Sequence, residues 1–297
     1  MQLKGVLAAT TTPFNPATGE VDVGGFRRNV QFLLDGSVAG LVVFGSTGEG
    51  PLVDPDERAE TLAAAREMAV DRLVLAGTGA ESTRATIRLC RAAAAAGADA
   101  VLVQPPGYFR SLMTAPALLE HYTRVADASP APVVLYQVPP PFRSVDLEIP
   151  LIVRLAEHPN IIGVKDSTGD LAALRELGAT CGEGFAVIVG TAAVLHDALD
   201  AGACAGILAL AAFAPYECTE LYRRWQSGER DEAGRLQVEA ARLHRAVVAQ
   251  FSVPGVKAAL DLLGLVGGPP RPPLRALGAA ERAIVAEAMR AASRIQH

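Results

Sequence analysis

This 297-residue sequence contains very little lysine. Its 27 basic residues are 24 arginines and three lysines, Lys4, Lys165 and Lys257. Where a position requires only a positive charge, this chain therefore uses arginine. Lys165 ends the hydrophobic run that starts at Asn160, and such a placement indicates chemistry that a guanidinium cannot perform. Only an amine can lose its proton and act as a nucleophile near neutral pH.

Several classes of protein are excluded by other features that the sequence lacks. It has no block of basic residues and a net charge of −5, which argues against nucleic-acid binding. No apolar run reaches the ~18 residues expected of a membrane helix. The segment 1–14 has only a short apolar stretch before polar residues and proline, so it is not typical of a signal peptide. We therefore expect a cytoplasmic protein with neither membrane nor nucleic-acid partners.

The patterns typical of metal sites are also missing. The four cysteines form no CxxC pair, and we expect them to be small, buried, apolar residues. The five histidines form no HxH or HExxH pattern. We therefore predict no metal and no cofactor.

Short apolar runs rich in β-branched residues recur along the chain. They are spaced by roughly 20–35 residues, the span of a strand and a crossover helix. The segments between them have helical character, for example 54–70, which opens with an Asp–Pro start signal, and 81–97, which stops at Gly97. Eight such runs predict a (β/α)8 TIM barrel, and a doubly wound sheet is the alternative, although it would favour a GxGxxG turn that is absent. The runs begin at Gly5, Gly40, Arg72, Asp99, Pro132, Asn160, Phe185 and Ala205.

After about Phe213 the strand pattern stops and helical patterns follow. The segment 214–251 indicates two helices with a break near Gly228, and 252–267 indicates a third. The proline-rich segment 267–274 is a rigid link before a last helix at 279–295. We predict that residues 1–225 form the barrel with the active site and that residues 226–297 form a C-terminal helical region.

Unusual polar residues follow several of the predicted strands. In an α/β barrel the chemistry lies at the C-terminal ends of the strands, so these residues should gather on one rim. Their convergence is a stronger indication than any one of them alone. They are Ser46 and Thr47 in "GSTGEG", Tyr108, Tyr136, Lys165, and the Gly190–Thr191 pair.

Lys165 is the candidate nucleophile toward a 2-oxo acid. Apolar surroundings favour the neutral amine, which can attack a carbonyl and form an iminium that accepts electrons from an adjacent C–C bond. The alternative is a lysine that reaches solvent or pairs with Asp166. Tyr136 is the candidate proton shuttle, and the alternative is a tyrosine packed in the barrel mouth.

The loop "GSTGE" offers hydroxyl groups and backbone N–H groups that can hold a carboxylate. Taken alone it is a weak motif, because glycine-rich turns with serine or threonine are common. We expect Glu49 to fix this loop rather than to act as a base.

Five segments, in this order, carry a resemblance to a known family: "TTPF" near Thr11, "GSTGE" at 45–49, "YQVP" at 136–139, "GVKDSTGD" at 163–170 and "GVKAALDLLGL" near Gly255. The chain resembles the dihydrodipicolinate synthase / N-acetylneuraminate lyase family of class I, Schiff-base pyruvate-type aldolases over nearly its whole length.

The resemblance implies roles for individual residues. Lys165 would be the Schiff-base lysine and Tyr136 the proton-relay phenol. Ser46 and Thr47 would bind the carboxylate of the oxo acid, and Thr47 would link Tyr136 to a second tyrosine. Tyr108 matches that second tyrosine, which in the family enters the site of a neighbouring subunit. Further substrate-binding positions are Gly190 and Leu208, and the family implies a homotetramer built as a dimer of dimers.

One departure concerns the second substrate. Dihydrodipicolinate synthase usually carries an arginine shortly after the segment that matches Tyr136, and the corresponding position here is Pro141. Arg143 lies two residues later and is the candidate replacement for binding a carboxylate of the aldehyde. The segments 108–122 and 155–170 resemble the 4-hydroxy-2-oxoglutarate aldolase branch more closely.

We therefore predict a carbon–carbon lyase that acts on pyruvate or a pyruvate-derived 2-oxo acid, with an aldehyde as its other substrate or product. The alternatives with the same site are 4-hydroxy-tetrahydrodipicolinate synthase, which condenses pyruvate with aspartate semialdehyde, and a dehydratase of sugar-derived 2-oxo acids. Alternatives from other classes are a metal-dependent barrel aldolase, which a chelator would inactivate, and a non-catalytic barrel that binds oxo acids.

Overall fold

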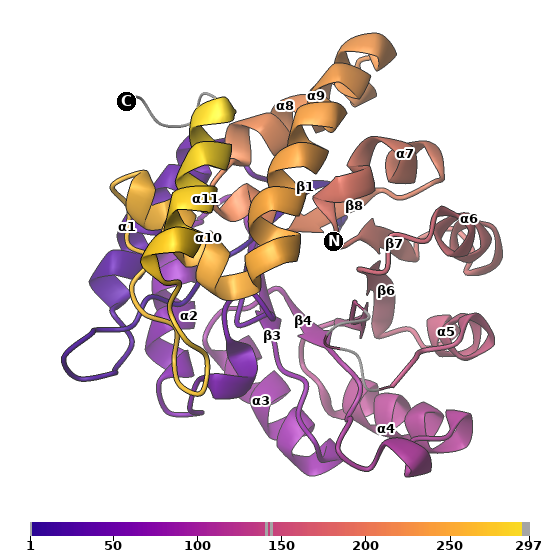
Figure 1. Ribbon diagram of the computed structural model, residues 1–297. Helices are drawn as coiled ribbons and strands as arrows, with labels where there is room; N and C mark the ends of the chain where they lie inside the picture. Colours follow the sequence, from indigo (N-terminus) through magenta and orange to yellow (C-terminus); the bar gives the residue numbers. More distant parts are fainter. Residues whose placement is uncertain (1, 140–141, 143–144, 293–297) are drawn as a thin grey trace.

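A closed barrel of parallel strands forms the centre of the structure, a computed structural model that describes residues 2–139, 142 and 145–292 (Figure 1). Each strand pairs with the next along the chain, and the last pairs with the first. The predicted (β/α)8 fold is confirmed, and every strand falls within one of the apolar runs. The strands are β1 (Gly5–Ala9), β2 (Gly40–Val43), β3 (Leu73–Gly77), β4 (Ala100–Val103), β5 (Val133–Gln137), β6 (Ile161–Asp166), β7 (Ala186–Val189) and β8 (Ala205–Leu208).

Helices connect successive strands and surround the barrel (Figure 1). Short 3-10 turns precede four of them: η1 (Gly50–Leu52), η2 (Arg110–Leu112), η3 (Ala192–Val194) and η4 (Leu210–Ala212). The helices are α1 (Val23–Asp35), α2 (Arg58–Met68), α3 (Thr83–Ala95), α4 (Ala115–Ala128), α5 (Ile149–Ala156), α6 (Leu171–Thr180), α7 (Leu195–Asp200) and α8 (Pro215–Gln226).

Local signals explain where these helices begin and end. The Ser82 side chain accepts a hydrogen bond from the backbone N–H of Ala85 and caps α3, and Gly97 follows its end with a φ of +95°. The Asp–Pro signal at 54–55 gave a wrong start for α2, which begins at Arg58. The Glu57 carboxylate accepts the N–H of Asp54 and pairs with Arg271, so the residues before α2 form a separate turn.

Alternate residues along the strands pack into two separate clusters. The cluster with Leu7, Val42, Leu75, Val134 and Ile188 fills the barrel. Tyr136 belongs to this cluster and lies near the C-terminal end of β5. The cluster with Val6, Leu41 and Val43 also contains the inner faces of the helices. The strands are therefore buried on both faces, as near-continuous apolar runs require in a parallel sheet.

The C-terminal segment is helical, as predicted. It contains α9 (Arg230–Leu243), a π-helical segment η5 (His244–Ala249), α10 (Gln250–Leu262) and α11 (Ala279–Ala291). α9 packs against α8 and α11 packs against α10 on one side of the barrel (Figure 1). α10 is broken at Ser252, whose φ is 51°, where the third helix of this region was predicted to begin. The division between 225 and 226 stays a prediction.

In the part of the chain that the structure describes, no helix has the length and apolar character needed to cross a membrane. Cys90 and Cys218 are buried as expected, whereas Cys181 and Cys204 are partly exposed.

Candidate active site

Lys165 and Tyr136 are register partners on neighbouring strands. β5 and β6 run parallel, and Tyr136 lies opposite Lys165 at their C-terminal ends. Register partners in a sheet project to the same face, so both side chains point into the barrel mouth. The Lys165 Nζ atom lies 4.2 Å from the centroid of the Tyr136 ring. The amine is therefore held over the face of the phenol.

Lys165 was predicted to be a nucleophile, and the alternative was a lysine that reaches solvent or pairs with Asp166. Its charge environment distinguishes the two. Lys165 is only 5% exposed, so it does not reach solvent. The Asp166 carboxylate accepts hydrogen bonds from the backbone N–H and the hydroxyl of Thr168, at 2.7 and 2.5 Å. Among the described residues, no carboxylate forms an ion pair with Lys165. The amine therefore remains available for chemistry.

A cavity of about 230 Å³ lies beside the lysine amine. It brings together Ser46, Thr47, Tyr136, Lys165 and Gly190 from four different strand ends. The predicted convergence of these five residues on one rim is thus present in the fold. Other residues of its lining are Pro139, Phe142, Ser167, Thr191, Ala209, His244, Val248, Ala249, Ser252, Val253 and Val256.

The loop after β2 turns sharply beneath the cavity. Phe44 and Glu49 both have positive φ values, 58° and 56°, which non-glycine residues rarely adopt. Gly50 is required here because a Cβ atom would clash with the carbonyl oxygen of Phe44. The Ser46 hydroxyl shares a hydrogen bond of 3.2 Å with the Tyr136 phenol. Strained turns of this kind gather at functional sites, where the surrounding structure maintains them.

Ser46 provides the hydrogen bond that the resemblance assigned to Thr47. Thr47 lines the same cavity. Its part in a proton relay stays a prediction. Which of two adjacent hydroxyls meets the phenol depends on the backbone angles of the turn, and these were not readable from "GSTGE".

A buried ion pair holds the same loop from below. The Glu49 carboxylate lies 2.6 Å from the Lys257 amine of α10 and accepts the backbone N–H of Arg271 at 2.7 Å. Burial lowers the pKa of Lys257, and the nearby Glu49 carboxylate opposes that shift. Glu49 is thus engaged in fixing the loop, as expected from the sequence.

The far wall of the cavity was largely missed by the sequence reasoning. Ser167 is buried against Gly190, where a Cβ atom would clash with the Ser167 hydroxyl, so only glycine fits. The Thr191 hydroxyl lies 3.2 Å from the His244 Nε2 atom. Burial, with a smaller contribution from Arg245, lowers the pKa of His244 to about 4. This wall is therefore polar but uncharged at neutral pH.

The signals for these residues were weak. Ser167 follows Lys165 by two positions within the "GVKDSTGD" segment, and nothing in that segment distinguishes it from Thr168. His244 lies far away in the sequence, on the π-helical segment η5, and no local pattern connects it with the barrel. π-helical turns do recur at functional sites, but they are not visible in a sequence.

Comparison with known proteins agrees with this geometry. The model of the Dihydrodipicolinate synthetase family matches residues 2–292. The chain belongs to this family.

Its relatives have more than one activity in their names. A probable mitochondrial 4-hydroxy-2-oxoglutarate aldolase of Emericella nidulans is 37% identical over 284 residues, covering 94% of this chain and 91% of that protein. A 4-hydroxy-tetrahydrodipicolinate synthase of Acidiphilium cryptum is 36% identical, covering 96% and 97%. The crystal structure of dihydrodipicolinate synthase from Acinetobacter baumannii complexed with pyruvate has a TM-score of 0.93 at 31% identity, covering 99% and 100%.

Two candidate residues of this family member do not line the cavity, and a third is not described. Tyr108 is 81% exposed on the loop after β4. Leu208 is fully buried at the end of β8, and its neighbour Ala209 lines the cavity instead. Arg143 and Pro141 lie outside the described residues, so the role of Arg143 stays a prediction.

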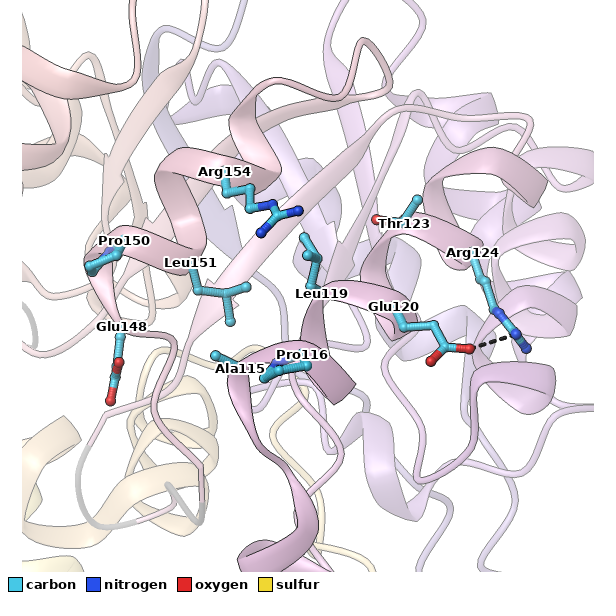
Figure 2. A pocket seen from close by; sticks show the side chains of 10 residues that line it. All are labelled: Ala115, Pro116, Leu119, Glu120, Thr123, Arg124, Glu148, Pro150, Leu151 and Arg154. Atoms are coloured by element: carbon cyan, nitrogen blue, oxygen red, sulfur yellow. Dashed lines mark ion pairs between the residues drawn. The ribbon is translucent and has the colours of Figure 1, made fainter.

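Several other hollows are larger than this cavity, and two of them are informative about it. One of about 480 Å³ adjoins it, shares Ser46, Phe142, Ser252 and Val253 with it, and continues toward Glu81. Another of about 720 Å³ is an open groove between α4 and α5, shown in Figure 2. Its Arg124 pairs with Glu120 at 2.6 Å, and the predicted catalytic residues do not line it. Size alone would therefore indicate the wrong site.

Within the described ranges, no group of three or more His, Cys, Asp or Glu side chains is arranged to hold a metal ion.

Proposed function

We propose that this family member is a class I lyase that forms a Schiff base through Lys165 with pyruvate or a pyruvate-derived 2-oxo acid. The observation that carries the proposal is the position of the Lys165 amine. It is buried, lies over the Tyr136 ring and adjoins a cavity, with no described carboxylate to hold it as an ion-paired cation.

The reaction begins when the neutral amine attacks the C2 carbonyl. A C–N bond forms, the carbonyl oxygen leaves as water, and a protonated imine remains. In the cleavage direction the C3–C4 bond breaks, and its electron pair moves into the iminium to give an enamine, while the 4-hydroxyl loses its proton and becomes the carbonyl of the aldehyde. In the opposite direction the enamine carbon attacks an aldehyde. In the cleavage direction, C3 of the enamine then takes up a proton and the iminium forms again. In either direction, water adds to the iminium carbon, the C–N bond breaks, and the 2-oxo acid and the free lysine are released.

Tyr136 and Ser46 are placed to move protons during these steps. The phenol lies beside the amine, and its oxygen shares a hydrogen bond with the Ser46 hydroxyl. Proton transfer by a positioned side chain typically contributes about 10²–10⁴-fold to a rate. The Ser46 and Thr47 hydroxyls and the backbone N–H groups of the loop hold the carboxylate of the 2-oxo acid, and Gly190 leaves room beside it.

The cavity and its adjoining hollow leave room for an aldehyde of more than one size. The names of the relatives favour two reactions, cleavage of 4-hydroxy-2-oxoglutarate and condensation of pyruvate with aspartate semialdehyde. A dehydratase of sugar-derived 2-oxo acids would use the same Lys165 chemistry. Assays with these three substrate classes decide between the activities and identify the aldehyde.

We also propose a homotetramer built from dimers. Tyr108, Phe109 and Leu112 are 81%, 62% and 64% exposed on one loop, which is unusual for apolar side chains that lie so close together in sequence. A partner subunit would cover them, and Tyr108 would reach the partner's site. Sedimentation of the chain and of its Tyr108→Ala/Phe109→Ala variant tests this assembly. Location in the cytoplasm stays a prediction.

Reduction with borohydride in the presence of pyruvate tests the Schiff base directly. We expect irreversible mass addition on the peptide that contains Lys165, and none without pyruvate. Lys4 and Lys257 serve as internal controls, because they are the other lysines in the chain. The absence of an adduct with pyruvate and with longer 2-oxo acids would exclude the proposed mechanism and would favour a binding protein.

A further inference from the structure

The second buried lysine of the chain lies under the loop that carries Ser46 and Thr47. Lys257 is 1% exposed, and its partner Glu49 is 2% exposed. The two charged atoms are 2.6 Å apart. Moving two charges out of water carries a large desolvation cost, so such a pair is seldom explained by stability alone.

The polar atoms of the pair contact two other segments of the chain, α10 and the 267–274 link. Glu49 belongs to the 45–50 loop, and its second oxygen accepts the backbone N–H of Arg271 at 2.7 Å. The Lys257 amine also donates to the carbonyl of Pro269 at 2.8 Å and lies 4.5 Å from the centroid of the Phe14 ring. The pair therefore fastens the loop to α10 and to the 267–274 link at once.

The loop needs such an anchor because its backbone is strained. Glu49 itself has a φ of 56° and lies between two glycines. A residue with such a φ is strained and persists only where its surroundings hold it. Three residues before Glu49, the Ser46 hydroxyl meets the Tyr136 phenol at 3.2 Å. A shift of Glu49 would therefore move Ser46 and Thr47 relative to the phenol and the cavity.

We infer that Lys257 is a positioning residue that, through Glu49, sets the Ser46 and Thr47 hydroxyls to receive the carboxylate of the 2-oxo acid. The inference rests on the proposed function, because it assigns the carboxylate to this loop. The C-terminal helical region thereby contributes to substrate binding without touching the substrate.

The test compares a neutralised pair with a matched control. Lys257→Met alone leaves a buried carboxylate without its partner, so the measured variant is the double Glu49→Gln/Lys257→Met. The amide that replaces the carboxylate keeps an oxygen for the Arg271 N–H but loses the bond to α10. The control is Asp99→Asn, at the opposite end of the barrel. The Asp99 carboxylate pairs with Arg66 at 2.8 Å and accepts the backbone N–H of Val74 at 2.8 Å, so it too binds one cation and one N–H group.

The readout is the rate of borohydride trapping on Lys165 as a function of pyruvate concentration, measured with folded protein. We expect the half-saturating concentration in the double variant to rise by about tenfold to a hundredfold, because misplacing binding groups by about 1 Å has effects of this size. The trapping rate at saturating pyruvate should stay close to that of the parent chain, since the lysine itself is unchanged. Asp99→Asn should lower the melting temperature and leave the half-saturating concentration unchanged.

Two results would overturn the inference while leaving the proposed function intact. One is an unchanged half-saturating concentration in the double variant. The other is an equal rise in Asp99→Asn, which would make the effect a general consequence of lost stability. If the parent chain itself forms no adduct with pyruvate or a longer 2-oxo acid, the proposed function fails, and the positioning role fails with it.

Discussion

Lys165 and Lys257 are both buried and both lie over an aromatic ring, yet their surroundings differ in one respect. The amines are 4.2 and 4.5 Å from the ring centroids of Tyr136 and Phe14. Lys257 has the carboxylate of Glu49 at 2.6 Å, whereas Lys165 has a cavity and, within the described part of the chain, no carboxylate partner. Burial and ring contact are therefore shared, and the counter-charge separates the two sites.

This difference assigns the two lysines to different tasks. A lysine paired with a buried carboxylate serves as a fixed anchor, because moving either group away would leave the other buried without a partner. The Lys165 amine has no described carboxylate to hold it, so it is free to reach into the cavity and attack a carbonyl. A chain that otherwise uses arginine keeps lysine at both places, but only one of them requires a nucleophile.

The largest difference between the two lysines should come from Lys165→Met, which keeps the apolar stem and removes the amine. We expect carbon–carbon lyase or synthase activity to fall on the order of 10⁵-fold, as when a covalent nucleophile is removed. Turnover and borohydride trapping measure this loss. The melting temperature should change little, because no ion pair is broken. Retained trapping elsewhere in the chain would contradict the assignment of Lys165.

Much of this assignment was accessible from the sequence. The apolar run before Lys165 and the spacing of eight such runs predict a parallel barrel, and the C-terminal ends of parallel strands meet on one rim. The scarcity of lysine then marked Lys165. For Lys257 the same scarcity was visible, but its partner Glu49 lies about 200 residues away in the sequence, and no local pattern connects them. Long-range pairs of this kind require the fold.

For Lys257→Met the same comparison predicts a large loss of stability, whereas Lys165→Met should change stability little. Removing one partner of a buried ion pair typically destabilises a protein by about 3–5 kcal/mol, because the other charge remains buried. Urea unfolding should show this loss, and the double variant with Glu49→Gln should recover part of it. A stability equal to that of the parent in Lys257→Met would show that the pair is not energetically coupled, and the contrast between the two lysines would be lost.

The details of the site were less accessible than its location. Thr47 and Ser46 are adjacent and chemically alike, so the sequence could not decide which hydroxyl meets Tyr136. His244 and Ser167 reach the cavity through a π-helical segment and a close glycine contact, which are properties of backbone geometry. The resemblance implies that Tyr108 enters the site of a neighbouring subunit. Its exposure agrees with such a contact, but the contact itself stays a prediction.

A smaller effect should follow from Tyr136→Phe, which keeps the ring beneath Lys165 and removes only the hydroxyl. If the hydroxyl moves protons and the ring only supports the amine, turnover should fall by about 10²–10³-fold while trapping on Lys165 still proceeds, more slowly. Comparing the turnover and trapping rates of one variant measures the two roles separately. Complete loss of trapping would mean that the hydroxyl is needed to form the imine itself.

The smallest expected effect concerns pH and involves the uncharged wall of the Lys165 cavity. Burial lowers the pKa of His121 to about 4, and burial with Arg245 lowers that of His244 to about 4. In the unfolded chain these imidazoles titrate near 6.5. As the pH falls from 7 to 5, the unfolded state gains protons that the folded state does not, so the free energy of unfolding should decrease.

The expected decrease is about 2 kcal/mol for each imidazole over this range, which lies above the pH at which most carboxylates titrate. Urea unfolding at pH 7 and pH 5 measures it. The variants His121→Gln and His244→Gln should each flatten the dependence, but only His244→Gln changes the cavity beside Lys165 and should alter the half-saturating pyruvate concentration. The double variant Glu49→Gln/Lys257→Met should leave the slope between pH 7 and 5 unaltered, because it leaves no unpaired buried carboxylate and no described histidine contacts the Glu49 pair. An equal slope in the parent and in the double histidine variant would mean that these imidazoles take up protons in the folded chain as readily as in the unfolded chain, and the wall facing Lys165 would then gain positive charge between pH 7 and 5.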